Sequence, residues 1–103
     1  MCISAKRLTC MAALELWGPE AQTVMVFEEM SELQKELCKH ARGKDNREAI
    51  AEEIADVRIM LEQMCILHNC DELAAEYEEK KLERLRERIE KEVKGKEEPA
   101  WND

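Results

Sequence analysis

NREAIAEEIADVRIMLEQMCILH, residues 46–68, is the stretch of the chain that decides its fold. Its apolar residues recur every three or four positions, a pattern that predicts an amphipathic helix. On a helical wheel with about 100° per residue, Glu53 falls inside the apolar face and Asp56 lies beside it. The apolar residues that surround Glu53 there are Ile50, Ile54, Val57, Met60, Leu61 and Met64. An unpaired carboxylate in such a place is costly to bury, so the pattern indicates a bound partner.

A second pair of acids, Glu29 and Glu32, lies in the preceding helical pattern at the edge of another apolar stripe. That stripe consists of Val26, Met30, Leu33 and Leu37. Residues three apart share a helix face, so each pair directs two carboxylates toward one point. The basic residues of the third helix, Arg47 and Arg58, fall away from its acidic face. Four carboxylates without a cation favour a bound divalent metal over a buried ion pair, and oxygen ligands suit Mg²⁺ or Mn²⁺.

The composition predicts an all-α protein of four helices, a short one followed by three longer ones. Hydrophobic residues make up 45% of the 103 residues and charged residues 39%, with only three glycines and two prolines, which is typical of helical chains. Gly18 and Pro19 separate the first two helices, and Gly43 ends the second. Asp45 and Glu48 have the spacing of a capping box that opens the third helix. The expected helices are about 3–16, 19–41, 46–68 and 72–94.

Residues 1–94 are expected to form a single helical domain, with residues 95–103 as a polar C-terminal tail. A helical chain of this length buries little surface alone, which predicts a homodimer or homotetramer. Val24 and Phe27 form a second apolar side of the second helix. Either a neighbouring subunit or the short first helix would cover that side.

The net charge of −8 argues against a nucleic-acid polymer as partner, because no basic face compensates for it. No segment approaches the ~20 apolar residues that a membrane span needs. Five cysteines without a Cys-x-x-Cys pair, and no secretory signal, favour reduced thiols and a cytoplasmic location. Glu36, Glu48 and Glu62 are expected on solvated helix faces, the usual place of acids in a charged helical protein.

The two acidic pairs belong to a wider pattern, Glu28-Glu29-x-x-Glu32 followed after twenty residues by Glu53-x-x-Asp56. Three segments of the chain fit the same pattern: WGPEAQ (17–22), EEIADV (52–57) and KKLERL (80–85). Over most of its length the chain resembles the MazG-type nucleoside triphosphate pyrophosphohydrolases of the all-α NTP pyrophosphatase superfamily. The resemblance implies a MazG-like helical bundle that hydrolyses an NTP or dNTP between its α and β phosphates, giving a nucleoside monophosphate and pyrophosphate.

The resemblance also implies roles for individual residues. The family's Mg²⁺ ligands correspond to Glu29, Glu32, Glu53 and Asp56, which are therefore candidate catalytic residues. Glu28 belongs to the same motif and either orients or deprotonates the attacking water, or is simply solvated. Lys81 and Arg84 match the family's phosphate-contacting residues. The alternative for both is a surface ion pair with Glu78 or Glu83.

Trp17 and Gln22 are candidates for contacts to the nucleoside. Trp17 would stack on a base or, alternatively, cap the core. Gln22 would contact the base or ribose or, alternatively, be solvated or serve as a cap. The implied biological role is clearance of unwanted nucleotides. Restricted alternatives are a dUTP or dCTP pyrophosphatase and a phosphoribosyl-ATP pyrophosphohydrolase, which uses related acidic motifs. The alternative from another class is a non-catalytic helical interaction module.

Overall fold

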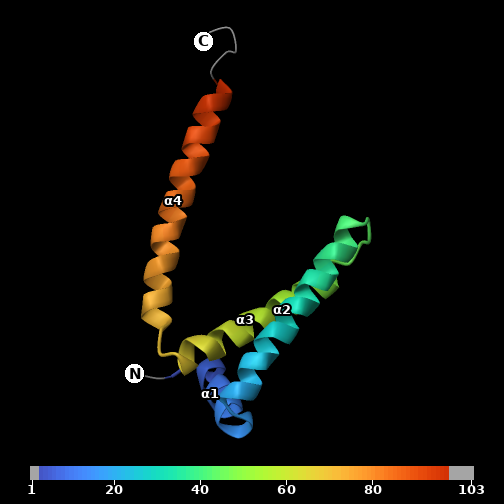
Figure 1. The fold of residues 1–103 in the computed structure, drawn as a ribbon, viewed down its shortest axis with the longest axis vertical. Helices are drawn as coiled ribbons and strands as arrows, with labels where there is room; N and C mark the ends of the chain where they lie inside the picture. The colour runs from blue at the N-terminus through green and yellow to red at the C-terminus, as the bar shows by residue number, and fades with distance from the viewer. Residues whose placement is uncertain (1–2, 98–103) are drawn as a thin grey trace. The chain divides into compact units, whose positions relative to one another are not determined.

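The computed structural model describes residues 3–97, and in that range it contains four α-helices and no strand. The helices are α1 (Ala5–Trp17), α2 (Pro19–Ala41), α3 (Arg47–Leu67) and α4 (Asp71–Glu97) (Figure 1). The predicted all-α class, with one short helix followed by three longer ones, is therefore confirmed. Within residues 3–97 no helix is both long and apolar enough to cross a membrane.

The helices fall into two units, one that ends at Cys70 and contains α1 to α3, and one that begins at Asp71 and contains α4. The grouping of residues 1–94 in one domain stays a prediction. Helix α4 continues to Glu97, so the expected tail of residues 95–103 begins as helix. Residues 98–103 lie outside the described part of the chain.

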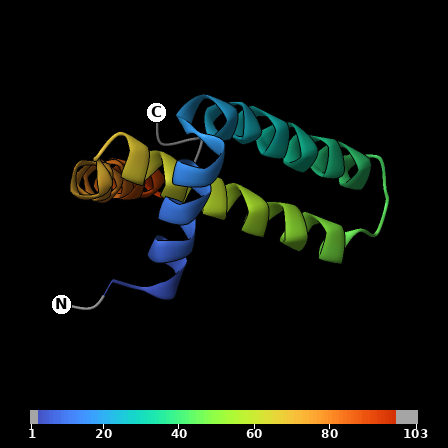
Figure 2. The same cartoon turned by 90° about the horizontal axis from the view of Figure 1, so that it is seen from below.

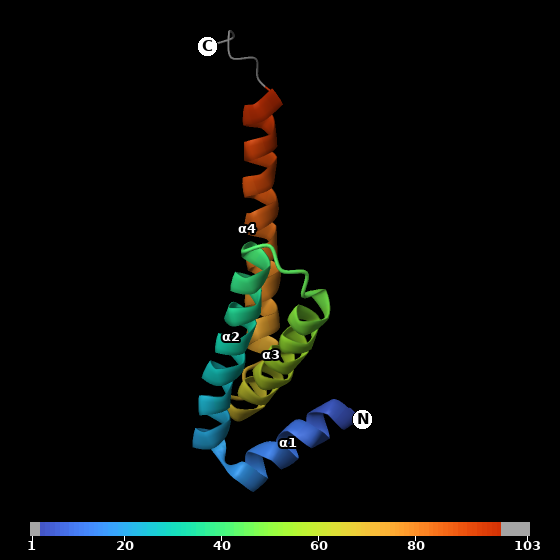
Figure 3. The same cartoon turned by 90° about the vertical axis from the view of Figure 1, so that its right-hand side faces the viewer.

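Helix α1 ends where the sequence predicts. Gly18 has a φ of +91°, a value that favours glycine, and Pro19 occupies the first position of α2. At the other end of α1, the Ser4 side chain accepts a hydrogen bond from the Arg7 backbone N–H at 3.1 Å. The sharp change of direction at Gly18 lets α1 pack across both other helices of its unit (Figure 3).

Helices α2 and α3 lie side by side and antiparallel, joined by a short loop (Figure 2). Gly43 ends α2 with a φ of +100°, as predicted. This α2–α3 hairpin makes the most extensive helix packing in the first unit. Its antiparallel course means that early residues of α2 face late residues of α3.

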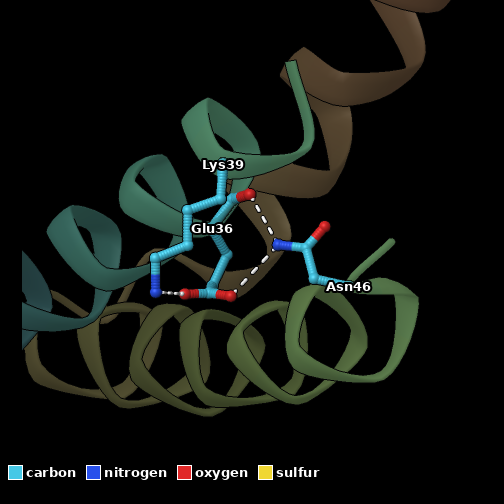
Figure 4. Close-up of polar contacts among 3 residues, drawn as sticks. All are labelled: Glu36, Lys39 and Asn46. Carbon is cyan, nitrogen blue, oxygen red and sulfur yellow. Dashed lines mark hydrogen bonds and ion pairs between the residues drawn. The ribbon is translucent and has the colours of Figure 1, made fainter. Parts of the chain in front are cut away.

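The predicted capping box at the start of α3 is wrong. The residue before the helix is Asn46, and its side chain makes no capping bond. The Asn46 Nδ2 instead donates to the Glu36 backbone oxygen at 2.8 Å and to Glu36 Oε1 at 3.1 Å (Figure 4). Through these two hydrogen bonds the buried Asn46 side chain connects the loop to α2, and it does not cap α3. Sequence spacing alone does not distinguish these two uses of a polar residue at a helix start.

Glu36 is likewise not solvated, contrary to expectation, because only 9% of it is exposed. Lys39 Nζ lies 2.9 Å from its carboxylate (Figure 4). The hydrogen bonds from Lys39 and then Asn46 lower the pKa of Glu36 below its ordinary value. Glu62 is also partnered, at 3.7 Å from Arg7 of α1, whereas Glu48 is exposed as expected.

The core of the described chain is small and unusually polar. Seven of its residues are buried, and four of these are polar: Gln22, Glu36, Asn46 and Gln63. The three apolar ones are Cys10, Val26 and Met60. Phe27 is 65% exposed, so the alternative in which α1 covers it is wrong. Hydrogen bonds therefore matter more for this fold than in an ordinary helical core.

Replacement of Asn46 by alanine tests the tie between the loop and α2. Asn46→Ala leaves the Glu36 acceptors without their donor, so we expect the melting temperature to fall by roughly 5 °C. Asp45→Ala is the matched control, because Asp45 is exposed and forms no cap. Thermal unfolding followed by circular dichroism measures both. A larger fall in melting temperature for Asp45→Ala than for Asn46→Ala would contradict this interpretation and support a capping box at Asp45.

Candidate metal centre

Three carboxylates converge in the middle of the α2–α3 hairpin. Glu29 of α2 and Glu53 and Asp56 of α3 each offer an oxygen, and these oxygens lie within 4.8 Å of one another. All three residues are half-buried. Glu53 and Asp56 are about one helical turn apart, so both lie on the face of α3 that packs on α2. The predicted convergence of acids from two helices is thus present for these three.

Within residues 3–97 the acids of this cluster have no cationic partner. In the part of the chain that the structure describes, no lysine or arginine forms an ion pair with Glu29, Glu53 or Asp56. Glu53 Oε2 is fully buried and accepts no hydrogen bond. A buried carboxylate oxygen without a donor is costly, and either protonation or a bound cation lowers that cost. The donor set is all oxygen, which fits Mg²⁺ or Mn²⁺.

The electrostatics of the cluster follow from this crowding. Burial raises the pKa of Glu29, and the charges of Asp56, Glu53 and Glu32 raise it further, as does a hydrogen bond with Asp56. Burial is also the main cause that raises the pKa of Glu53, followed by the charges of Asp56 and Glu32. Without a cation the cluster therefore tends to hold protons.

The other two predicted acids lie at the edge of this cluster. Glu32 is exposed, and its carboxylate is not among the three that converge. Its charge nevertheless raises the pKa of both Glu29 and Glu53, so it acts on the cluster electrostatically. Glu28 is exposed and lines a neighbouring cavity instead.

The predicted phosphate-binding residues lie on α4, in the second unit. Lys81 and Arg84 are exposed and line one shallow hollow of about 320 Å³ together with Leu85 and Arg88. Of the two acids proposed as surface partners, Glu83 pairs with Arg86 at 2.8 Å. The approach of Lys81 and Arg84 to the acids of the first unit stays a prediction.

Trp17 and Gln22 line a single cavity of about 710 Å³ in the first unit. Trp17 is 64% exposed and does not cap the core, and Gln22 is 6% exposed and is not solvated. The core-capping alternative for Trp17 and the solvated alternative for Gln22 are thus wrong, and contact of either residue with a nucleoside stays a prediction. The sequence interpretation overlooked Gln63, which lines the same cavity and is only 4% exposed. Its spacing was the available signal, since Gln63 follows Asp56 by seven residues, as Gln22 precedes Glu29 by seven.

Comparisons of the chain with protein-family models, with curated proteins and with solved structures found no match.

The raised pKa values generate a test of the metal centre. The ordinary pKa of these carboxyls is 4.5. Above that pH, Glu29 and Glu53 hold more protons in the folded protein than in the unfolded chain, because folding raises their pKa values. The stability of the metal-free protein should therefore fall as the pH rises from 4.5 through the raised pKa values of Glu29 and Glu53. Mg²⁺ needs deprotonated ligands, so the gain in melting temperature on adding MgCl₂ should grow over the same pH range.

Differential scanning calorimetry from about pH 5 to about pH 8, with and without MgCl₂, measures both effects. Glu53→Gln should melt higher than the wild type without metal at neutral pH, and should lose most of the Mg²⁺ effect. Glu48→Gln, which removes an exposed charge from the same helix, should behave like the wild type. Equal Mg²⁺ stabilisation of Glu53→Gln and wild type would contradict the assignment.

Proposed function

We propose that this protein is a Mg²⁺-dependent nucleoside triphosphate pyrophosphohydrolase, which hydrolyses the α–β phosphoanhydride to a nucleoside monophosphate and pyrophosphate. The observation that carries the proposal is the convergence of Glu29, Glu53 and Asp56 with a buried, unpartnered oxygen. Sequence motifs add to it, because the same acids form the two pairs that resemble the MazG-type enzymes. Mn²⁺ is the alternative metal, since it takes the same ligands.

The three converging acids would hold the metal, and Glu32 would join them when its exposed side chain turns inward. A bound Mg²⁺ supplies charge neutralisation for the polyphosphate and a lowered pKa for attacking water. Glu28, one residue before Glu29, is free to orient that water, because it is exposed and outside the ligand set. The half-buried acids would thus bind the metal, and the exposed Glu28 would remain available to the water.

Lys81 and Arg84 would supply positive charge to the departing pyrophosphate. Both lie on one side of α4, where they border the same hollow with a further arginine, Arg88. An arginine can grip two phosphate oxygens at once, whereas a lysine acts as a point charge. Negative charge grows on the leaving group during hydrolysis, so cations placed there stabilise the transition state more than the substrate.

On this proposal the chain is a member of the all-α NTP pyrophosphatase superfamily with a role in clearing unwanted nucleotides in the cytoplasm. A dUTP or dCTP pyrophosphatase is the version of the same chemistry restricted to one base. A non-catalytic interaction module would need neither a convergent acid cluster nor buried acceptors without donors.

Pyrophosphate release over a panel of NTPs and dNTPs with MgCl₂ tests the proposal. Glu53→Gln and Asp56→Asn should each lower kcat by about 10²-fold or more, because they remove ligand charge while they keep side-chain shape. Glu48→Gln is the matched control and should retain activity. The proposed function would be contradicted if the wild type hydrolysed no triphosphate, or if Glu53→Gln kept full activity.

The proposal includes a homodimer or homotetramer. The apolar side chains of Leu16, Trp17, Val24 and Phe27 at the α1–α2 end of the first unit are all more than half exposed. Helix α4 likewise exposes Leu82, Leu85, Ile89 and Val93. Apolar surface of this extent on a chain with so small a core favours burial against a second copy.

Sedimentation equilibrium tests the oligomer. The wild type should have at least twice the mass of one chain, and Phe27→Glu should shift it toward the monomer, because a buried charge would oppose association. Glu20→Lys is a control for charge changes on α2, since Glu20 is exposed near the start of that helix. A monomeric wild type at micromolar concentration would contradict this part of the proposal.

A further inference from the structure

One row of residues on α4 has the spacing of a seam between paired helices. Its members are three and four positions apart in turn, which keeps their side chains on a single face of the helix. In chain order they are Asp71, Ala74, Glu78, Lys81, Leu85 and Arg88. Asp71 is half-buried, and the five residues after it are exposed. This row, called the α4 seam, is therefore open to a partner over most of its length.

The middle of the α4 seam lines a hollow of about 450 Å³. Its lining consists of the four central seam residues together with Tyr77 and Leu82. With about 100° per residue, Tyr77 and Leu82 lie on opposite sides of the seam. Each of them is 54% exposed, and Leu85 within the seam is 48% exposed. Large apolar side chains gathered in this way around a hollow are typical of a surface that meets another protein.

The α4 seam is complementary to itself when a second copy runs in the opposite direction. Two-fold symmetry makes the contacts reciprocal, so that residue i meets j and j meets i. With the axis between Glu79 and Lys80, residues at equal distances from that point come to the same level. The facing pairs are then Asp71 with Arg88, Ala74 with Leu85, and Glu78 with Lys81. An acid meets a base in two of these pairs, and a small side chain meets a large one in the third.

The charges at the centre of the seam are available for this pairing. Within residues 3–97 neither Glu78 nor Lys81 forms an ion pair, although they are three residues apart on one helix. Glu83 and Arg86 have the same spacing, lie away from the seam and do form an ion pair, at 2.8 Å. The unpaired charges are thus those that would face a second copy.

The same charges select the direction of the partner helix. A parallel pair would place Glu78 beside Glu78 and Lys81 beside Lys81 of the second copy, and like charges at an interface oppose association. In the antiparallel pair each Glu78 lies opposite a Lys81, twice by symmetry. Charge complementarity therefore favours the antiparallel arrangement over the parallel one.

We propose that α4 pairs antiparallel with α4 of a second copy of this chain, through the seam from Asp71 to Arg88. This inference deepens the homo-oligomer of the proposed function, on which it rests, and does not depend on the reaction. The ammonium group of Lys81 has three donors, so it can bind Glu78 of the second copy and still contact a phosphate. The register also has a limit, because Val93 lies opposite no residue of the second α4.

Charge reversal in the full-length chain, followed by sedimentation equilibrium, tests the pairing. Glu78→Lys and Lys81→Glu should each weaken association by about 10-fold or more, because each brings like charges together twice. In a tetramer this loss would leave dimers, and in a dimer it would leave monomers. An equimolar mixture of the two variants should associate as the wild type does, since every facing pair in that heterodimer again joins an acid and a base.

Two controls fix the surface and the register. Glu83→Lys and Arg86→Glu, alone or mixed, make the same charge changes off the seam and should associate as the wild type does. Leu85→Glu should weaken association, whereas Val93→Glu should not, because only Leu85 faces the second α4. Single seam variants that associate as tightly as the wild type, or a mixture that associates no more tightly than its components, would overturn the inference.

Pyrophosphate release by the wild type, measured in parallel, separates this inference from the proposed function. Association restored by mixing, without turnover of any triphosphate, would retain the α4 pairing and reject the pyrophosphohydrolase. Turnover together with unimpaired association of Glu78→Lys and Lys81→Glu would retain the enzyme and reject the pairing. An oligomer that Phe27→Glu dissociates and the seam variants do not would assign assembly to the first unit, and would also overturn the inference.

Discussion

The polar residues packed between α2 and α3 are the constraint on which the rest of the structure depends. On α2 they recur at every seventh position, at Gln22, Glu29 and Glu36. Their counterparts are Gln63, Asp56 and Glu53 of α3 and Asn46 of the loop before it. Ordinary helix pairs keep such positions apolar, and buried polar groups need partners. Asn46 and Lys39 satisfy the Glu36 carboxylate, whereas Asn46 Oδ1, Glu53 Oε2 and Gln63 Oε1 are buried without a partner among the described residues. Among these layers only the one with Glu29, Glu53 and Asp56 also brings several carboxylates together, so it is where a cation would lower the free energy most.

On the proposed function, a single ligand would meet two of these layers. The charged layer suits a divalent cation with phosphates, and the neutral amide layer, about 10 Å further along the same hairpin, suits an uncharged group with a polar edge. A nucleoside triphosphate contains both parts in that order. On the same proposal, the exposed apolar residues of the first unit would meet a second copy, and the basic residues of α4 would contact phosphate.

The sequence was sufficient for the helices and for most of the acid cluster, because periodicity reports which face of a helix is buried. Glu53 is the best example, since the apolar residues around it on the wheel indicated its buried oxygen. Asn46 and Glu36 show the limit of such reasoning. Their hydrogen bond joins residues ten apart across a loop, and a wheel describes only one helix. Gln63 was overlooked for the same reason, because the residues that line its cavity come from three helices.

A titration of the protein with Mn²⁺, followed by electron paramagnetic resonance without nucleotide, tests the central claim most directly. The account predicts saturable binding by the wild type and by Glu48→Gln, competition by Mg²⁺, and affinity at least about 10-fold weaker for Glu53→Gln, because removal of one charged ligand weakens a site of hard oxygen donors. Binding by Glu53→Gln that is as tight as that of the wild type, or no binding by the wild type, would contradict it.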